Sequence, residues 1–140
     1  MSVGEHCQRD PVKIRGDLTI REVAKQMEVR DVGCVVAVDH DERPIGILTD
    51  RDITLRVLRT GLDPDETQAA AVMEGGVETV RENTRLTTAM RRMRADAVRR
   101  LPVVDGEGRL VGLFHWSHAL GIVSDELRQA AQVAAAQNQA

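Results

Sequence analysis

Side chains suited to chemistry gather where an apolar stretch gives way to a polar one, in Gly46-Ile47-Leu48-Thr49-Asp50-Arg51-Asp52. Thr49 offers a hydroxyl where a strand should stop, and Asp52 can accept two hydrogen bonds from a vicinal diol such as a ribose. Arg51 could meet a phosphate, which the free amides at a helix start also favour. The same spacing would arise if Thr49 and Asp52 only capped a helix, and spacing alone favours capping. A sugar-phosphate site and a helix cap therefore remain alternatives.

Composition argues against several classes of protein. The 140 residues carry 22 acidic and 19 basic side chains, a formal charge of −3, and 42% of them are apolar, so one globular core is possible. With one Trp, one Phe and no Tyr, stacking platforms for nucleic-acid bases are nearly absent. The sequence has neither a secretory signal nor the ~20 consecutive apolar residues that span a bilayer. We expect a cytoplasmic protein that binds neither nucleic acid nor membrane.

No pattern of nucleophiles indicates an enzyme. Cys7 and Cys34 are not spaced like a metal clip or a redox pair, and Cys34 begins an apolar run that favours burial. No Ser/His/Asp, Cys/His or close carboxylate set stands out in the sequence. We therefore expect no catalytic activity.

The chain contains an internal repeat. With an offset of 66 residues, positions 14–58 align with 80–124 without a gap, and the hydrophobic pattern stays in phase. The identical positions are Arg15/Arg81, Met27/Met93, Val32/Val98, Val38/Val104, Asp39/Asp105, Arg43/Arg109, Gly46/Gly112 and Val57/Val123. Each unit is too small to bury a core alone, so the two should pack against one another.

Each unit indicates the order strand, helix, strand, turn, strand, helix. In the first unit we expect a short extended piece at 12–14, a helix at 18–27 and strands at 34–38 and 44–48. The second unit repeats this pattern, with strands at 101–104 and 110–114, and helix is favoured again from 124 onward. Asp17 or Thr19 should cap the first helix, and Asn83 or Thr84 its counterpart. Met27, Met90 and Met93 have helical spacing and should serve packing. The pattern predicts an α/β fold.

These features resemble a tandem pair of cystathionine-β-synthase (CBS) domains, a Bateman module. The resemblance rests on the duplicated plan, on Val35–Asp39 with 46–52, on the connector Gly61-Leu62-Asp63-Pro64, and on Arg100–Asp105 with Gly112-Leu113-Phe114. It implies two βαββα repeats related by a pseudo-twofold axis and forming one compact module. The expected division is 10–60 for the first repeat, 61–74 for a connector, 75–124 for the second repeat and 125–140 for a helical tail. Two modules are expected to form a homodimer.

The resemblance also implies an adenosine ligand in a cleft between the repeats. Asp52 would hold the ribose hydroxyls, and Thr49 with Arg51 would face the phosphates. Ile47 and Val32 from the first repeat would flank the base, together with residues of the second. The full set of candidate nucleotide-binding residues is Val32, Gly33, Cys34, Ile47, Thr49, Arg51, Asp52, Val77, Glu78, Val98, Arg99 and Arg100.

The second repeat departs from this pattern. His115 stands where the first repeat has Thr49, and His118 where it has Asp52. Imidazole cannot accept two hydrogen bonds from a diol as a carboxylate can. The sequence places Arg99 and Arg100 at the rim of that cleft, whereas the matching positions of the first repeat are Gly33 and Cys34. The ribose acid and the arginines are thus divided between the two repeats. We expect one nucleotide cleft per chain. A metal site at His115 and His118 is disfavoured, because two ligands are too few.

Two functions are consistent with the sequence. The first is a regulatory module without activity of its own, which senses AMP, ADP or ATP, with NAD or S-adenosylmethionine less favoured, and signals to an unknown partner protein. The second is a ligand-free dimeric scaffold whose helical tail docks a partner. The lone indole, Trp116, should lie beside a cleft and serve as a fluorescent probe.

Overall fold

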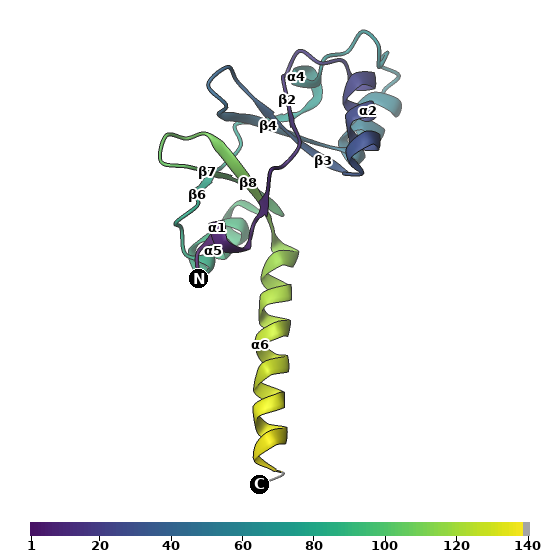
Figure 1. Cartoon of the computed structure of the whole chain (residues 1–140). Helices are drawn as coiled ribbons and strands as arrows, with labels where there is room; N and C mark the ends of the chain where they lie inside the picture. Colours follow the sequence, from purple (N-terminus) through teal and green to yellow (C-terminus); the bar gives the residue numbers. More distant parts are fainter. Residues whose placement is uncertain (139–140) are drawn as a thin grey trace.

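The chain folds into two α/β halves stacked on one another, with a long helix projecting from them (Figure 1). This computed structural model describes residues 1–138. In chain order the elements are α1 (Val3–His6), β1 (Gln8–Arg9), β2 (Lys13–Ile14), α2 (Ile20–Arg30), β3 (Cys34–Val38), β4 (Pro44–Thr49), α3 (Asp50–Ile53), the π-helical η1 (Thr54–Leu58), α4 (Ala69–Val72), β5 (Glu74–Gly75), β6 (Val80–Arg81), α5 (Leu86–Asp96), β7 (Arg100–Val104), β8 (Leu110–His115) and α6 (Trp116–Gln137).

Each half contains a four-stranded sheet. The strand orders are β2-β3-β4-β5 and β1-β8-β7-β6. In each sheet one pair is parallel, β2 with β3 or β6 with β7, and its strands are joined by a crossover helix, α2 or α5. Parallel neighbours need such a crossover, whereas the hairpins β3–β4 and β7–β8 need only a turn. The predicted α/β fold with two repeats is confirmed.

The two halves exchange a short strand. β1, near the N-terminus, pairs with β8 of the second half, with Gln8 opposite Leu113. β5 pairs with β4 of the first half, with Glu74 opposite Ile47. The offset of 66 residues maps α1 onto α4 and β1 onto β5, so the exchange is reciprocal. The segment 61–74, predicted as a connector, therefore contains α4 and the first residue of β5, which complete the first sheet.

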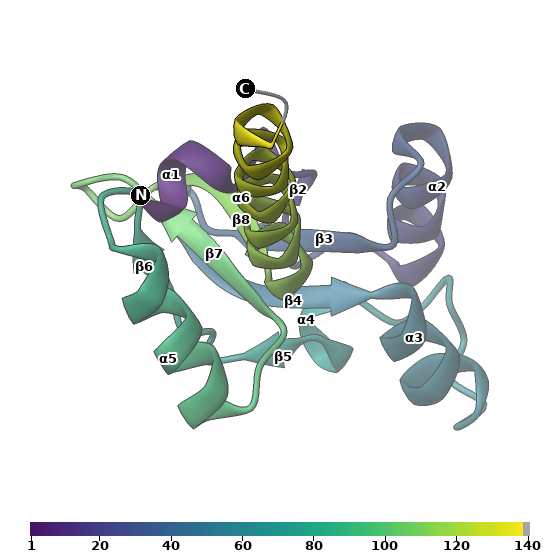
Figure 2. The ribbon, with the colours of Figure 1, turned by 90° about the horizontal axis from the view of Figure 1, so that it is seen from below.

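The core consists of three apolar clusters. In one half Ile20, Val23 and Met27 of α2 pack against β3, and in the other Ala89 and Met93 of α5 pack against β7 and β8. The third cluster lies between the sheets and contains Val36, Val38, Leu110 and Leu113, all nearly inaccessible to solvent. β3 and β7 are covered by helices on one face and by the other half on the other, which explains their continuous apolar sequences. Figure 2 shows the hairpins of the two halves crossing.

The two equivalent helices begin in different ways. Thr19 caps α2 in a reciprocal arrangement with Glu22, as one of the two predicted alternatives required. The prediction that Asn83 or Thr84 caps α5 is wrong, because α5 starts one residue later, after Arg85, without a side-chain cap. Its Leu86 amide donates to the carbonyl of Met1 at 3.1 Å, just as the Ile20 amide of α2 donates to the carbonyl of Thr67 at 2.9 Å. The two helix starts thus share this backbone hydrogen bond and differ in the side-chain cap, which only α2 has.

The helix α6 continues directly from β8 and runs through the predicted tail without a break. Its 22 residues extend about 33 Å at 1.5 Å per residue, and none of its side chains is buried. Ala119, in its first turn, packs against the second core cluster, and the rest projects from the body (Figure 1). Residues 139–140 of the predicted tail lie outside the described residues. Among residues 1–138, no helix combines the length and apolarity that crossing a bilayer needs.

Gly46 and Gly112 allow the exchanged strands to approach. A Cβ on Gly46 would lie 2.6 Å from Met73 Sδ and 2.8 Å from the Glu74 carbonyl oxygen, and one on Gly112 would lie 2.5 Å from Cys7 Sγ. Another backbone, rather than a ligand, therefore accounts for the glycine at position 46. These contacts hold β5 against β4 and β1 against β8.

The close approach at Gly46 predicts a destabilising effect of a single methyl group. We expect Gly46→Ala to reduce the free energy of unfolding by about 1–3 kcal/mol, because Met73 and the backbone of Glu74 must shift. Gly75→Ala is the matched control, because it lies opposite Gly46 in the same pair of strands and a Cβ there meets nothing within 4 Å. Urea unfolding of both variants measures the difference, and equal effects would contradict the argument.

Candidate functional site

Two cavities lie between the halves, and the larger one contains Asp52. It has a volume of about 800 Å³, within the range of small-molecule sites. The first half contributes the end of β4 and the start of α3, and the second half contributes the segments after β5 and before β7. Its lining residues are Ile47, Thr49, Arg51, Asp52, Glu74, Gly75, Gly76, Val77, Glu78, Asp96, Ala97, Val98, Arg99, Arg100 and Leu101. We call this the Asp52 cavity.

The smaller cavity, of about 430 Å³, contains the two neighbouring histidines of α6 and β8. Its lining residues are Gln8, Pro11, Val12, Asp31, Val32, Gly33, Cys34, Arg100, Leu113, His115, Ser117 and His118. Apart from Arg100, each of them is 66 residues from a lining residue of the Asp52 cavity. We call this the His118 cavity. Arg100 lines both, so it lies between them.

The structure brings nine of the twelve candidate residues together in the Asp52 cavity. The other three, Val32, Gly33 and Cys34, line the His118 cavity, so the expectation that Val32 flanks the base beside Asp52 is corrected. The expectation that Arg99 and Arg100 lie at the rim of the cleft with the histidines is corrected for Arg99, whereas Arg100 lines both cavities. Arg99 and Arg100 face the same cavity as Asp52, because each cavity combines the hairpin end of one repeat with the strand start of the other. The carboxylate and the arginines therefore line the same cavity.

Asp52 is both a helix cap and a cavity residue. Its Oδ2 accepts a hydrogen bond from the Thr49 amide at 2.9 Å, and the Thr49 hydroxyl accepts from the Asp52 amide at 3.1 Å. This capping box satisfies two amides at the start of α3. Each carboxylate oxygen has two acceptor positions, so the cap leaves acceptor capacity on Asp52. Capping the helix and binding a ligand are thus compatible roles for Asp52, because capping holds its carboxylate in place at the cavity.

Arg56 is a site-supporting residue that the sequence reasoning missed. Its Nε lies 3.9 Å from Asp52 Oδ1 and its second guanidinium nitrogen, Nη2, lies 3.6 Å from Glu74 Oε1. It also donates to the Val72 carbonyl at 2.9 Å. Arg56 therefore joins the start of α3 to the end of α4 and to β5. The spacing of four residues from Asp52 was the only signal in the sequence, because Glu74 and Val72 come close only in the fold.

The His118 cavity repeats the cap with different side chains. His118 Nδ1 accepts a hydrogen bond from the His115 amide at 3.1 Å, and His115 Nδ1 accepts from the Ser117 amide at 3.2 Å. Acceptance requires an unprotonated Nδ1, so the cap favours the neutral imidazoles. Burial lowers the pKa of both histidines, and the charges of Arg100, His118 and Arg99 lower that of His115 further.

Neither the histidines nor the cysteines form a metal site among the described residues. Within 1–138, no group of three or more His, Cys, Asp or Glu side chains is arranged to hold a metal ion. Burial raises the pKa of the Cys34 thiol to about 11, against the lowering effect of Arg100, so this thiol is a poor nucleophile. Cys7 and Cys34 are both free thiols. Trp116 lines neither cavity, although its neighbours His115 and Ser117 line the smaller one.

Comparison with known proteins agrees with this duplicated architecture. The sequence model of the CBS domain matches residues 3–59 and again 69–125. The chain belongs to the CBS domain family. Both matches include an exchanged element, α1 with β1 or α4 with β5. The predicted division left α1 and β1 outside both repeats and placed α4 in the connector.

Several relatives of this CBS domain pair are similar in sequence or structure. It is 38% identical over 113 residues to the uncharacterized protein MK0525 of Methanopyrus kandleri. This alignment covers 81% of this chain and 58% of that protein. The chain thus spans about three fifths of the length of such curated relatives. The CBS domain protein PAE2072 of Pyrobaculum aerophilum, solved in complex with AMP, is 31% identical with a TM-score of 0.75, over 84% of this chain and 89% of that one.

A third relative is hypoxic response protein 1 of Mycobacterium tuberculosis, which is 35% identical over 95 residues, covering 68% of this chain and 66% of that protein. A solved structure of Hypoxic Response Protein I with two coordinated zinc ions has a TM-score of 0.76, over 86% of this chain and 97% of that one. CBS pairs of this kind are ligand-binding regulatory modules rather than catalytic ones.

The histidines of the smaller cavity predict a loss of stability in mild acid. Both pKa values are below 6.5 in the folded chain, so the unfolded chain binds more protons as the pH falls through about 6.5, and the free energy of unfolding decreases. His118→Asn keeps an acceptor for the His115 amide but does not titrate. We expect its free energy of unfolding to fall less than that of the wild type between about pH 7.5 and about pH 5.5 in urea unfolding.

His40→Asn is the matched control, because His40 is exposed in a turn. This variant should show the same decrease in the free energy of unfolding as the wild type. The carboxylates whose pKa values are lowered, Asp39, Glu42, Asp65 and Asp105, contribute at lower pH, since their ordinary values are 3.8 and 4.5. A decrease in His118→Asn equal to that of the wild type would contradict the assignment.

Proposed function

We propose that this CBS pair is a regulatory module that binds an adenine nucleotide, AMP, ADP or ATP, in the Asp52 cavity and transmits its occupancy to a partner protein. The observation that carries the proposal is the coexistence in one cavity of a diol-binding carboxylate, three arginines and an apolar wall. Asp52 supplies the carboxylate, and Arg51, Arg99 and Arg100 supply the positive charge. NAD and S-adenosylmethionine are less favoured ligands.

The chemistry of the lining orients the ligand. Ile47, Val77 and Val98 offer an apolar surface for the purine, because burying a flat base against aliphatic groups is favourable. The ribose diol reaches the remaining acceptor positions of Asp52. Guanidinium groups pair with phosphate through charge-assisted hydrogen bonds, so the phosphates extend toward the arginines. The AMP complex of the Pyrobaculum aerophilum relative supports this ligand class.

We further propose one nucleotide site per chain. In the His118 cavity, His118 replaces Asp52, and Ser117 and Gly33 replace Arg51 and Arg99, whereas Arg100 lines both cavities. That cavity therefore has neither the diol-accepting carboxylate nor two of the three arginines. Its smaller volume, about 430 Å³ against about 800 Å³, supports the same distinction.

The proposal predicts a nucleotide-dependent rise in thermal stability. A ligand at about 100 times its dissociation constant adds about 2.7 kcal/mol to the free energy of unfolding, which raises the melting temperature by several degrees. We expect Asp52→Ala to lose this response to AMP, ADP and ATP. Thermal-shift measurements with each nucleotide test it, and isothermal titration calorimetry should give one site per chain.

His118→Ala is the matched control for this experiment. It removes the equivalent capping acceptor from α6, as Asp52→Ala does from α3, with a similar cost of about 1 kcal/mol. Because it lies in the other cavity, the response to nucleotide should persist. A wild-type melting temperature that does not change with any of the three nucleotides would refute the sensor, and equal loss in both variants would refute the assignment to Asp52.

An exposed apolar stripe on α6 supports self-association. Trp116, Leu120, Val123, Leu127, Ala130 and Ala134 are spaced alternately by four and three residues, the pattern of a coiled-coil seam. Leu120, Val123 and Leu127 are each more than half exposed, and no charged residue lies in the stripe. We propose that two copies pair through this stripe as a homodimer. The same surface supports the second candidate, a dimeric scaffold without ligand.

The stripe predicts that dimerisation depends on Leu127. Leu127→Asp should raise the dissociation constant of the dimer by at least about tenfold, because a carboxylate would be buried in the seam. Gln129→Asp adds the same charge on the opposite side of the helix and should leave association unchanged. Sedimentation equilibrium measures both. A wild-type chain that is monomeric at about 100 μM would contradict the homodimer.

The two candidate functions differ in their dependence on Asp52. For the sensor, Asp52→Ala abolishes the nucleotide response and leaves the dimer intact, whereas for the scaffold no nucleotide response exists. The proposal also includes a cytoplasmic location, the absence of catalysis and signalling to a partner protein.

A further inference from the structure

A third cavity lies on the second half alone, away from both interdomain cavities. Its volume is about 360 Å³, and its lining residues are Thr79, Arg81, Thr84, Arg92, Val104, Asp105 and Gly108. None of these residues lines the Asp52 or the His118 cavity. Two arginines and two threonine hydroxyls therefore face one concavity that the proposed nucleotide function does not use.

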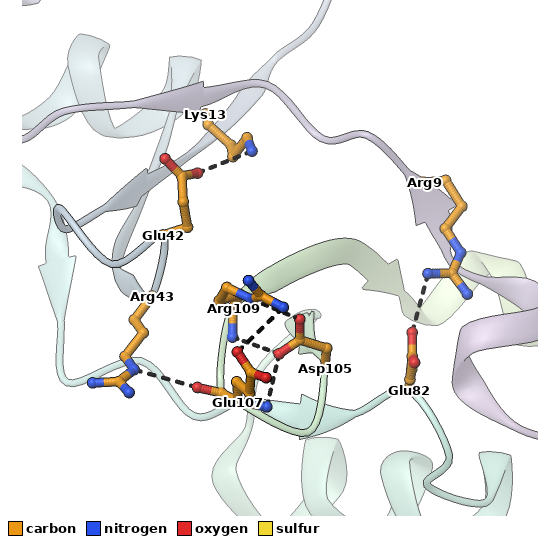
Figure 3. Close-up of polar contacts among 8 residues, drawn as sticks. All are labelled: Arg9, Lys13, Glu42, Arg43, Glu82, Asp105, Glu107 and Arg109. Atoms are coloured by element: carbon orange, nitrogen blue, oxygen red, sulfur yellow. Dashed lines mark hydrogen bonds and ion pairs between the residues drawn. The ribbon is translucent and has the colours of Figure 1, made fainter.

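The internal repeat provides a direct comparison for this cavity. At the equivalent place in the first half, Glu42 accepts a hydrogen bond from Lys13 at 3.0 Å (Figure 3). It also accepts one from Arg15 at 3.4 Å. Lys13 and Arg15 correspond, at the offset of 66, to Thr79 and Arg81. The first half thus satisfies its cations at this place with its own carboxylate.

The second half lacks this carboxylate, because a glycine stands at the equivalent position. Gly108 occupies the position of Glu42, and Arg92 occupies that of the neutral Gln26. Within residues 1–138, Arg81 forms no hydrogen bond or ion pair through its side chain, and Arg92 has only a 3.5 Å hydrogen bond to the Thr79 carbonyl. Compared with the first half, this cavity has lost the carboxylate of Glu42 and has the guanidinium of Arg92 in place of the ammonium of Lys13, so two cations remain without that carboxylate.

The remaining acid of the cavity, Asp105, already has hydrogen-bond partners within its own turn. Asp105 Oδ1 accepts from the amides of Glu107 and Arg109, at 2.9 and 3.0 Å, and its Oδ2 accepts from Arg109 Nε at 3.0 Å (Figure 3). These hydrogen bonds hold the pKa of the Asp105 carboxyl below its usual range. Asp105 is therefore engaged by the turn that follows β7, and Arg81 and Arg92 are left to set the charge of the cavity.

We propose that this third cavity binds a phosphate group, of inorganic phosphate or of a small phosphate monoester, between Arg81 and Arg92. A tetrahedral dianion has more acceptor positions than a carboxylate, and it can meet both guanidinium groups and the hydroxyls of Thr79 and Thr84 together. In this arrangement the ligand takes the place that the carboxylate of Glu42 has in the first half. The site is independent of the nucleotide site.

The repeat also supplies the variant that tests the proposal. Glu42 has a positive φ of 62° and Gly108 one of 83°, so a glutamate already adopts this backbone conformation in the first half. The atoms nearest to a Cβ on Gly108 would belong to Arg43, with its Nε 3.5 Å away, which is an ordinary contact. Gly108→Glu should therefore fold and place a carboxylate beside Arg81.

The measurement is titration of the full chain with inorganic phosphate and with glycerol phosphate at constant ionic strength. Amide chemical shifts of Thr79, Arg81, Thr84 and Gly108 in ¹⁵N-correlated NMR spectra report this cavity specifically. We expect both ligands to shift these signals, and Gly108→Glu to weaken binding by at least about tenfold. Arg92→Gln, which restores the residue of the first half, should weaken it as well.

Gly108→Ala is the matched control, because it adds the Cβ without the carboxylate and should bind within about twofold of the wild type. Asp52→Ala should also bind phosphate normally here, so failure of this site and failure of the nucleotide site are distinguishable. A response to inorganic phosphate but not to glycerol phosphate would restrict the ligand to the free ion. Unchanged binding in both Gly108→Glu and Arg92→Gln, or equal shifts with chloride, would overturn the proposal.

Discussion

The apolar seam between the two sheets is the interaction on which the rest of the structure depends. Val36 and Val38 of β3 and Leu110 and Leu113 of β8 are buried there. Because each sheet is covered by its helices on one face only, its other face must be buried against the second half. This contact brings the hairpin end of each repeat beside the strand start of the other, and both interdomain cavities follow from it. Asp52 meets Arg99 and Arg100 only because the seam is closed.

The duplicated backbone has been kept while its polar side chains diverged. The start of α3 is capped by Thr49 and Asp52, and the start of α6 by His115 and His118, with the same hydrogen-bond pattern. A carboxylate and a neutral imidazole both provide the acceptor that the helix requires. Capping therefore does not decide which residue stands there, and ligand chemistry can differ between the cavities at little cost to the fold. Glu42 and Gly108 differ in a similar way, because both adopt a positive φ but only Glu42 provides a carboxylate.

The elements were predictable where local patterns decide them. Helical spacing in α2 and apolar runs in β3 and β7 gave the correct element types, and the offset of 66 gave the duplication. The start of α5 was misplaced by one residue, because Asn83 and Thr84 are of the types that cap helices, whereas the cap position is taken by Arg85, which forms no side-chain cap. Val32 was assigned to the wrong cavity and Arg56 was missed because their neighbours belong to the other repeat or to β5.

The sequence by itself determined the repeat, the α/β class and the presence of a carboxylate capable of binding a diol, because these depend on residue type and local spacing. Only the tertiary structure decided which residues share a cavity. The exchange of β1 and β5 and the packing of the two sheets place Arg99 and Arg100 beside Asp52, and Gly33 and Cys34 beside His118. Such pairings arise from contacts between distant segments, whose relative position is set by burial of the apolar seam and by no local preference of the chain.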